Sequence, residues 1–71
     1  MKQLVSLREP QAEALQLRLS MAESRHRELD ARLRELGRHA YLTPTEQREI
    51  TALKKQKLRA KDEMADIRRV L

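Results

Sequence analysis

The sequence predicts an all-α fold: an antiparallel two-helix coiled-coil hairpin that self-associates into a helical bundle. Two long segments are rich in the strong helix formers Leu, Ala, Arg, Lys, Glu and Gln. In both segments apolar residues recur in alternating steps of three and four, which is the period of a coiled-coil seam. The short centre between them holds the single glycine and the second of the two prolines, residue types that end and begin helices.

The first helix is expected over residues 6–36. Ser6 and Glu9 have the S-x-x-E spacing of a capping box, in which each side chain accepts a hydrogen bond from the other residue's backbone N–H. Pro10 then lies in the first turn, where its missing N–H does little harm because those donors have no partner within the helix. The alternative is a short helix over residues 2–9 that ends before Pro10. We favour the continuous helix.

The loop is expected over residues 37–43 and the second helix over residues 44–70, so that the whole chain forms one domain. Gly37 suits the left-handed position that follows many helix ends. Residues 43–46 read Thr-Pro-Thr-Glu, which predicts a second capping box with the first threonine as N-cap and the proline at the first helical position.

The apolar stripes define the expected seam between the helices. A short loop requires antiparallel helices, and it places Leu36 opposite Ile50 next to the loop. At the other end of the hairpin the same register places Leu15 opposite Leu71. The stripe residues are Leu15, Leu19, Ala22, His26, Leu29, Leu33 and Leu36 in the first helix, and Ile50, Leu53, Lys57, Ala60, Met64, Ile67 and Leu71 in the second.

The charges beside the stripes also favour antiparallel helices. On one flank arginines of the first helix would face glutamates of the second, and on the other flank acidic residues would face basic ones. Parallel helices would bring like charges together on both flanks. Asp30 is expected near Lys54, and Glu23 is expected near Lys61. Each exposed pair contributes only about 0.3–1 kcal/mol, so these charges decide orientation more than stability.

Two motifs in these helices resemble the YdcH-like family of small bacterial proteins, which carry a domain of unknown function. The first is H-x-x-L-D, formed by His26, Leu29 and Asp30, and the second is L-K-K-x-K-L-x-x-K-D-E over residues 53–63. The resemblance implies a cytoplasmic helical hairpin with no assigned enzymatic activity. Members of the family have an Asn-Pro-x-Phe-like segment nearer to the first motif, whereas Pro10 lies further upstream here and the chain has no Phe.

The composition excludes several classes of functional site. The chain has no Cys, which fits a cytoplasmic protein, and its single Gly rules out glycine-rich phosphate loops. No apolar stretch approaches the roughly 20 residues that a membrane span needs. His26 and His39 have no neighbouring ligands at metal-binding spacing. We therefore expect no enzyme, no cofactor, no metal, no small-molecule substrate and no membrane association.

Apolar side chains outside the stripes are the candidate contacts for a second copy or a helical partner. Within a two-helix hairpin they have nothing to pack on, and apolar residues clustered in this way are typical of interfaces. A four-helix bundle of two hairpins would cover them. We therefore expect a non-enzymatic structural or interaction module. The candidate residues are Leu4, Val5, Leu7, Leu17, Met21 and Leu58.

The alternative function is a nucleic-acid- or ribosome-associated accessory protein that uses a basic helix face. The net charge is +5, and residues 54–61 carry five cations and no acid. On a helix, Lys55 and Arg59 project away from the seam and are the candidate phosphate contacts, together with arginines of the first helix. No aromatic residue lies among them to stack on bases, so this function is the second choice.

Two adjacent layers of the expected seam are polar. Lys57 lies opposite Leu29, and the next layer places His26 opposite Ala60. A lysine can extend its methylenes along a leucine and keep its ammonium in water. Because polar residues at single core positions can fix register or partner choice at some cost in stability, we expect these two layers to do the same.

Overall fold

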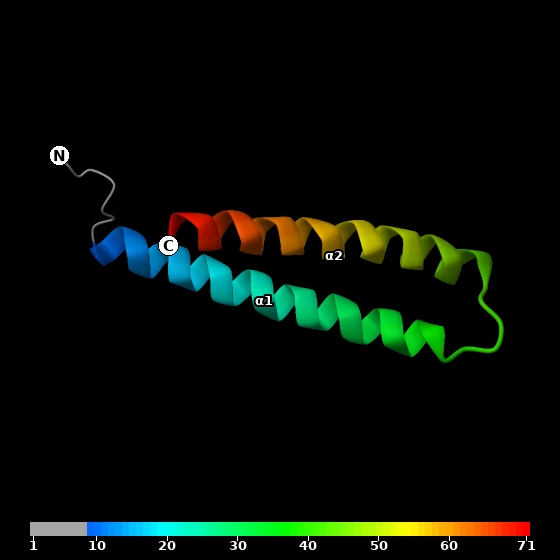
Figure 1. Ribbon diagram of the computed structural model, residues 1–71. Coiled ribbons are helices and arrows are strands. Elements are labelled where there is room, and N and C mark those ends of the chain that lie inside the picture. Colours follow the sequence, from blue (N-terminus) through cyan, green and yellow to red (C-terminus); the bar gives the residue numbers. More distant parts are fainter. Residues whose placement is uncertain (1–8) are drawn as a thin grey trace.

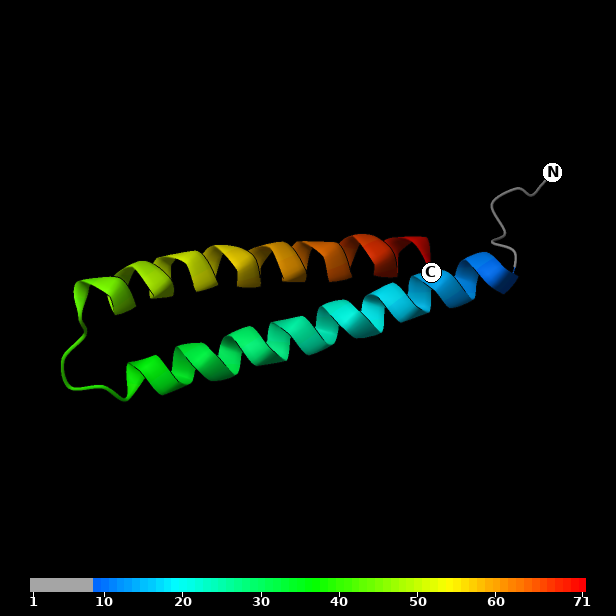
Figure 2. The ribbon, with the colours of Figure 1, turned by 180° about the vertical axis from the view of Figure 1, so that it is seen from behind.

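A computed structural model describes residues 9–71, which form two helices lying side by side (Figure 1). Helix α1 spans Glu9–Gly37 and helix α2 spans Pro44–Val70, and the described residues include no strand. The view from behind shows the same close pairing along the hairpin (Figure 2). The molecule is a thin rod of 59 × 14 × 13 Å. The predicted all-α hairpin is confirmed.

The start of α1 shows how the chain accommodates its first proline. Pro10 is the second residue of the helix, in the first turn, where the backbone N–H groups have no partner within a helix. Its missing donor therefore removes no helical hydrogen bond. The expected cap at Ser6, and the alternative helix over residues 2–9, fall on residues that lie outside the described part of the chain.

The end of α1 differs from the expected left-handed cap. Gly37 is the last helical residue, and no described residue has a positive φ, so the expectation that Gly37 is left-handed is wrong. Instead, the backbone N–H of Arg38 donates to the carbonyl of Glu35 at 3.1 Å, and that of His39 donates to the carbonyl of Leu36 at 3.1 Å. These short-range bonds tighten the last turn and satisfy carbonyls that the helix leaves free.

Replacement of Gly37 by alanine is expected to stabilise the hairpin. A Cβ at this position would meet no atom within 4 Å apart from its chain neighbours and the backbone of its own helix, and alanine restricts the unfolded chain more than glycine does. We expect urea denaturation to show a free energy of unfolding raised by about 0.5–1 kcal/mol. Gly37→Asn is the control, because asparagine tolerates the left-handed region. A loss of stability with alanine but not with asparagine would contradict the structure.

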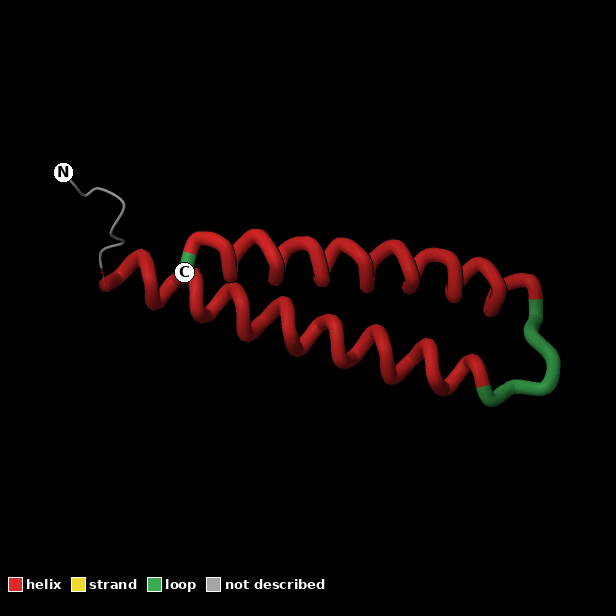
Figure 3. Tube along the Cα trace, viewed as in Figure 1, coloured by secondary structure: helices red, strands yellow, loops and turns green. Residues whose placement is uncertain are grey.

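The start of α2 confirms the predicted capping box. The hydroxyl of Thr43 accepts a hydrogen bond from the backbone N–H of Glu46 at 3.1 Å, and the carboxylate of Glu46 accepts one from the backbone N–H of Thr43 at 3.0 Å. Pro44 begins the helix. Nδ1 of His39 lies 3.0 Å from the same carboxylate, a contact that the sequence did not predict. The Glu46 side chain thus ties the loop, drawn in green in Figure 3, to the helix that follows it.

The core of the described hairpin is the seam between the two helices. Every buried residue of the described part occupies a predicted stripe position, and Leu36, next to the loop, is completely covered. Because two helices enclose only one such stripe each, most of the remaining surface is open to solvent. The buried residues are Ala22, Leu29, Leu36, Ala60, Met64 and Ile67.

Candidate interaction surfaces

One flank of the hairpin, the arginine flank, joins arginines of α1 to glutamates of α2. Arg32 binds Glu49 with two N–H groups, Nε at 2.7 Å and Nη2 at 3.0 Å from the two carboxylate oxygens. Arg25 and Arg18 approach Glu63 at 3.5 and 3.7 Å. The predicted meeting of opposite charges on this flank is confirmed. The paired hydrogen bonds of Arg32 make it the most directional of these contacts.

On the opposite flank, Asp30 has a different partner from the one expected. Its Oδ1 accepts a hydrogen bond from Nζ of Lys57 at 2.6 Å, and Nη2 of Arg34 lies 3.0 Å from its Oδ2, so the expected contact with Lys54 is wrong. Lys57 pairs with Asp30 because Lys57 lies in the seam opposite Leu29, the residue before Asp30. The ammonium of Lys57 therefore binds a carboxylate instead of standing alone in water. This hydrogen bond, and after it the charge of Arg34, holds the pKa of Asp30 below its usual value.

Glu23 also has a different partner, two turns further along α2 than the expected Lys61. Its Oε2 accepts a hydrogen bond from Nη2 of Arg68 at 3.0 Å, not from Lys61. Helical side chains tilt towards the N-terminus of their own helix. In antiparallel helices the two side chains therefore lean past each other, so that Glu23 meets a residue further along α2.

The sequence separation of the pairs between the helices confirms their antiparallel orientation. Nearest the loop, the partners are 17 residues apart in the pair Arg32–Glu49. In the middle of the hairpin they are 27 residues apart in Asp30–Lys57 and 38 in Arg25–Glu63. Nearest the chain end they are 45 residues apart in Glu23–Arg68. A separation that grows steadily away from a turn requires antiparallel helices.

The stability of the hairpin is expected to fall in acid. Hydrogen bonds hold the pKa of three carboxyls below their usual values: from Lys57 at Asp30, from the backbone of Thr43 at Glu46, and from Arg32 at Glu49. The unfolded chain then takes up protons at a higher pH than the folded chain. The contribution of these three carboxylates to the stability of the hairpin is fully present above the ordinary Glu pKa of 4.5. It is lost as the pH falls through their lowered pKa values.

Thermal unfolding followed by circular dichroism at pH 7, 4.5 and 3 tests this pH dependence. We expect the Tm to fall mainly below pH 4.5. The variant Glu49→Gln, which cannot be protonated, should show a smaller fall over the same interval. A Tm that is equal at pH 7 and pH 3 would contradict the expectation.

Four of the exposed large apolar side chains belong to the half of the hairpin away from the loop. Leu17 and Met21, one turn apart on α1, are 62% and 55% exposed, and Val70 and Leu71 at the end of the chain are 55% and 48% exposed. Figures 1 and 2 both show the C-terminus beside the first half of α1. We call these four residues the open-end cluster. The sequence had placed Leu71 in the seam and had not marked Val70, whereas Leu4, Val5 and Leu7 lie outside the described residues.

Leu58, the remaining apolar candidate, lies on a different surface. It lines a groove of about 240 Å³ with Leu33 of α1 and with Lys54, Lys57 and Lys61 of α2, which we call the lysine groove. Leu58 is 59% exposed, and Lys54 and Lys61 have no ion pair with any described residue. The sequence missed this groove because it assigned both lysines to pairs with α1.

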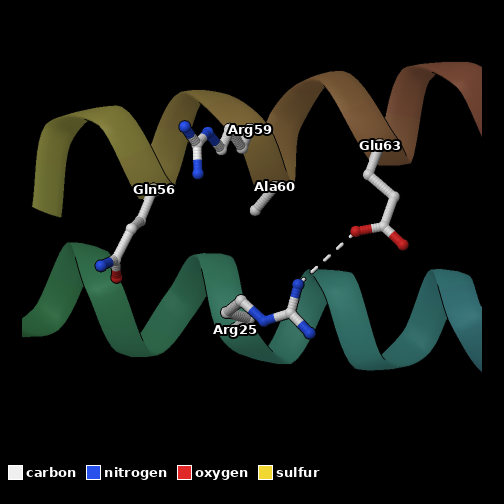
Figure 4. Close-up of a pocket in the computed structure, with 5 residues that line it drawn as sticks. All are labelled: Arg25, Gln56, Arg59, Ala60 and Glu63. Atoms are coloured by element: carbon white, nitrogen blue, oxygen red, sulfur yellow. Dashed lines mark hydrogen bonds and ion pairs between the residues drawn. The ribbon is translucent and has the colours of Figure 1, made fainter.

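The two candidate phosphate contacts do not share a concave site. Arg59 lines a second groove, of about 220 Å³, whereas Lys55 does not line it. Figure 4 shows Arg25 reaching from α1 towards Glu63 of α2 across this groove, while Arg59 and Gln56 extend from α2 beside it. One of the two arginines at the groove is therefore already paired with a carboxylate.

The polar seam position of His26 is half-buried, and its Nε2 is fully covered without a hydrogen-bond partner in the described part of the chain. Among residues 9–71 no three His, Asp or Glu side chains lie close enough together to hold a metal ion. No helix in this range has the length and apolar character needed to cross a membrane.

A family model described as "Protein of unknown function (DUF465)" matches residues 20–68. The match begins inside α1, ends near the end of α2, and includes both motifs. The chain belongs to the DUF465 family. YdcH-like proteins are the known type of DUF465, so the resemblance of the motifs is confirmed. Neither a curated protein nor a solved structure matches this DUF465 chain. The family description names no activity.

Proposed function

We propose that this DUF465 protein is a non-enzymatic interaction module that acts through helix contacts and self-associates through the open-end cluster. The observation that carries the proposal is the exposure of four large apolar side chains in the half of the hairpin away from the loop, each about half exposed or more. Large apolar side chains left exposed in one region are typical of protein interfaces. We assign no reaction to the chain, because its grooves are open and lined by side chains suited to contact.

The expected strength of association follows from the size of the cluster. Full burial of a side chain of this kind contributes about 1.5–3 kcal/mol. Because the side chains of the open-end cluster are about half exposed, covering the rest of each would contribute roughly half of that. Two copies together would gain roughly 6–12 kcal/mol. Association itself costs an estimated 4–15 kcal/mol, so the net gain is at most about 8 kcal/mol and a weak dimer, with a dissociation constant no tighter than micromolar, is expected. A two-fold arrangement would bring the cluster of one copy onto the same cluster of the other.

Sedimentation equilibrium over low to high micromolar concentrations tests the proposal. Leu17→Glu is expected to shift the protein towards monomer, and Leu17→Glu with Met21→Glu to abolish association, with helical circular dichroism retained. Leu58→Glu is the matched control, because it makes the same substitution at nearly the same exposure on another surface. A wild-type protein that stays monomeric at high micromolar concentration, or a control that dissociates equally, would refute the proposal.

The nucleic-acid alternative has one observation in its favour. Lys55 and Arg59 are exposed, and neither has an ion pair with a described residue. Binding to phosphates releases counterions and therefore weakens steeply with salt, whereas apolar helix contacts do not. Titration of duplex RNA at low and high salt, with Lys55→Gln and Arg59→Gln combined, tests this alternative. Salt-sensitive binding that the double variant loses would favour it.

A further inference from the structure

The two flanks of the hairpin differ in how far their charges are neutralised. On the arginine flank each of the three arginines that face α2 has a glutamate partner there. On the opposite flank Lys54 and Lys61 have no carboxylate partner within residues 9–71, and Lys57 shares Asp30 with Arg34. The lysine groove is therefore a positively charged surface with apolar side chains exposed in its middle.

We propose that the lysine groove binds an acidic amphipathic helix of a partner protein. Lys54, Lys57, Leu58 and Lys61 follow the i, i+3, i+4, i+7 spacing that defines one face of a helix. The two unpaired lysines, seven residues apart, are separated by two turns, or roughly 10 Å. A partner helix with leucine between carboxylates at the same spacing would place an acid beside each lysine and an apolar side chain on Leu58. This is the helix-in-groove mode of recognition.

Helix α1 supplies the other wall of the groove. Leu33 belongs to α1, and the lysines and Leu58 belong to α2, so a bound helix would pack against both helices at once. Leu58, now 59% exposed, would then be covered. The result is a local three-helix arrangement, in which the apolar side chains of the partner helix pack against Leu33 and Leu58.

Charge complementarity favours this occupant over the others. A second copy docked on the same groove through a two-fold axis would oppose lysine to lysine. A nucleic acid would neutralise Lys54 and Lys61 but would leave Leu33 and Leu58 without an apolar partner, and the groove has no aromatic side chain on which a base could stack. The groove is separate from the open-end cluster, so this proposal does not rest on self-association.

Fluorescence anisotropy with a designed acidic helix tests the proposal on the full chain. The probe is a labelled synthetic peptide of about 20 residues with leucine on one face and glutamate beside it, and its control has lysine at each glutamate. We expect the acidic peptide to bind and the basic peptide not to bind. Lys54→Gln with Lys61→Gln should weaken binding about five- to tenfold, the effect of losing two exposed ion pairs.

The matched control variant is Lys55→Gln with Arg59→Gln, which removes the same net charge from the outward side of the same helix. It should change the affinity less than twofold, and an equal loss in both double variants would overturn the proposal, because binding would then depend only on net charge. Duplex RNA that binds at the groove lysines while the acidic peptide does not would overturn it in favour of nucleic acid. Binding should persist in Leu17→Glu with Met21→Glu, and its loss there would overturn the proposal that the groove binds the helix independently of the open-end cluster.

Discussion

Truncation of Leu36 to alanine is expected to lower the free energy of unfolding by about 2–5 kcal/mol and to leave much of the chain unfolded. Leu36 is 0% exposed and is the largest fully covered side chain of the described residues. Its removal would leave a cavity where α1 meets the loop, bounded by a seam that can collapse only partly. A chain of this size rarely has more than about 3–5 kcal/mol to lose.

Urea denaturation at fixed protein concentration measures the effect of Leu36→Ala, and Leu58→Ala is its matched control. The control deletes the same atoms from a side chain that is 59% exposed, so it should cost less than about 1 kcal/mol. If Leu36→Ala cost no more than Leu58→Ala, the seam would not be the core of the protein in solution.

Replacement of both polar seam residues by leucine is expected to raise the Tm by the order of 10 °C. Nε2 of His26 is covered and has no hydrogen-bond partner among the described residues, and an unsatisfied buried group of this kind costs about 1–3 kcal/mol. Lys57→Leu adds apolar contact in the neighbouring layer. It also removes the hydrogen bond to Asp30, but that pair is partly exposed and such pairs contribute little.

The same double variant is expected to associate less selectively. Polar layers penalise alternative registers, so their removal should allow a broader distribution of assemblies in sedimentation. The single variants His26→Leu and Lys57→Leu complete a double-mutant cycle and show which layer is responsible. A double variant less stable than the wild type would show that His26 and Lys57 make specific favourable contacts, and the middle of the seam would then be the better candidate for a binding site.

The buried residues and the α2 cap could be predicted because both follow from local geometry. A coiled-coil period fixes which side chains face the partner helix, and every buried residue of the described part lies on the expected stripes. The capping box involves four consecutive residues, so Thr43 and Glu46 find each other without help from the rest of the fold.

The individual charge partners and the loop could not be predicted in the same way. Long side chains lean along their helices past the nearest heptad position, so heptad positions predicted the sign of the partners but not that Glu23 meets Arg68. The contact of His39 with Glu46 depends on the path of the loop, which no periodicity encodes. Likewise, Gly37 could end a helix in either of two backbone conformations, and the sequence alone favoured the wrong one.

The first and last described residues lie at the same end of the rod, which has a mechanical consequence. Glu9 and Leu71 lie at the end opposite the loop (Figure 1). A force that pulls these two points apart loads one layer of the seam at a time, as in the opening of a zipper, and reaches Leu36 last. A force along the rod, applied between the loop and the opposite end of one helix, would instead load all layers together. The hairpin should therefore peel open under small forces while resisting shear.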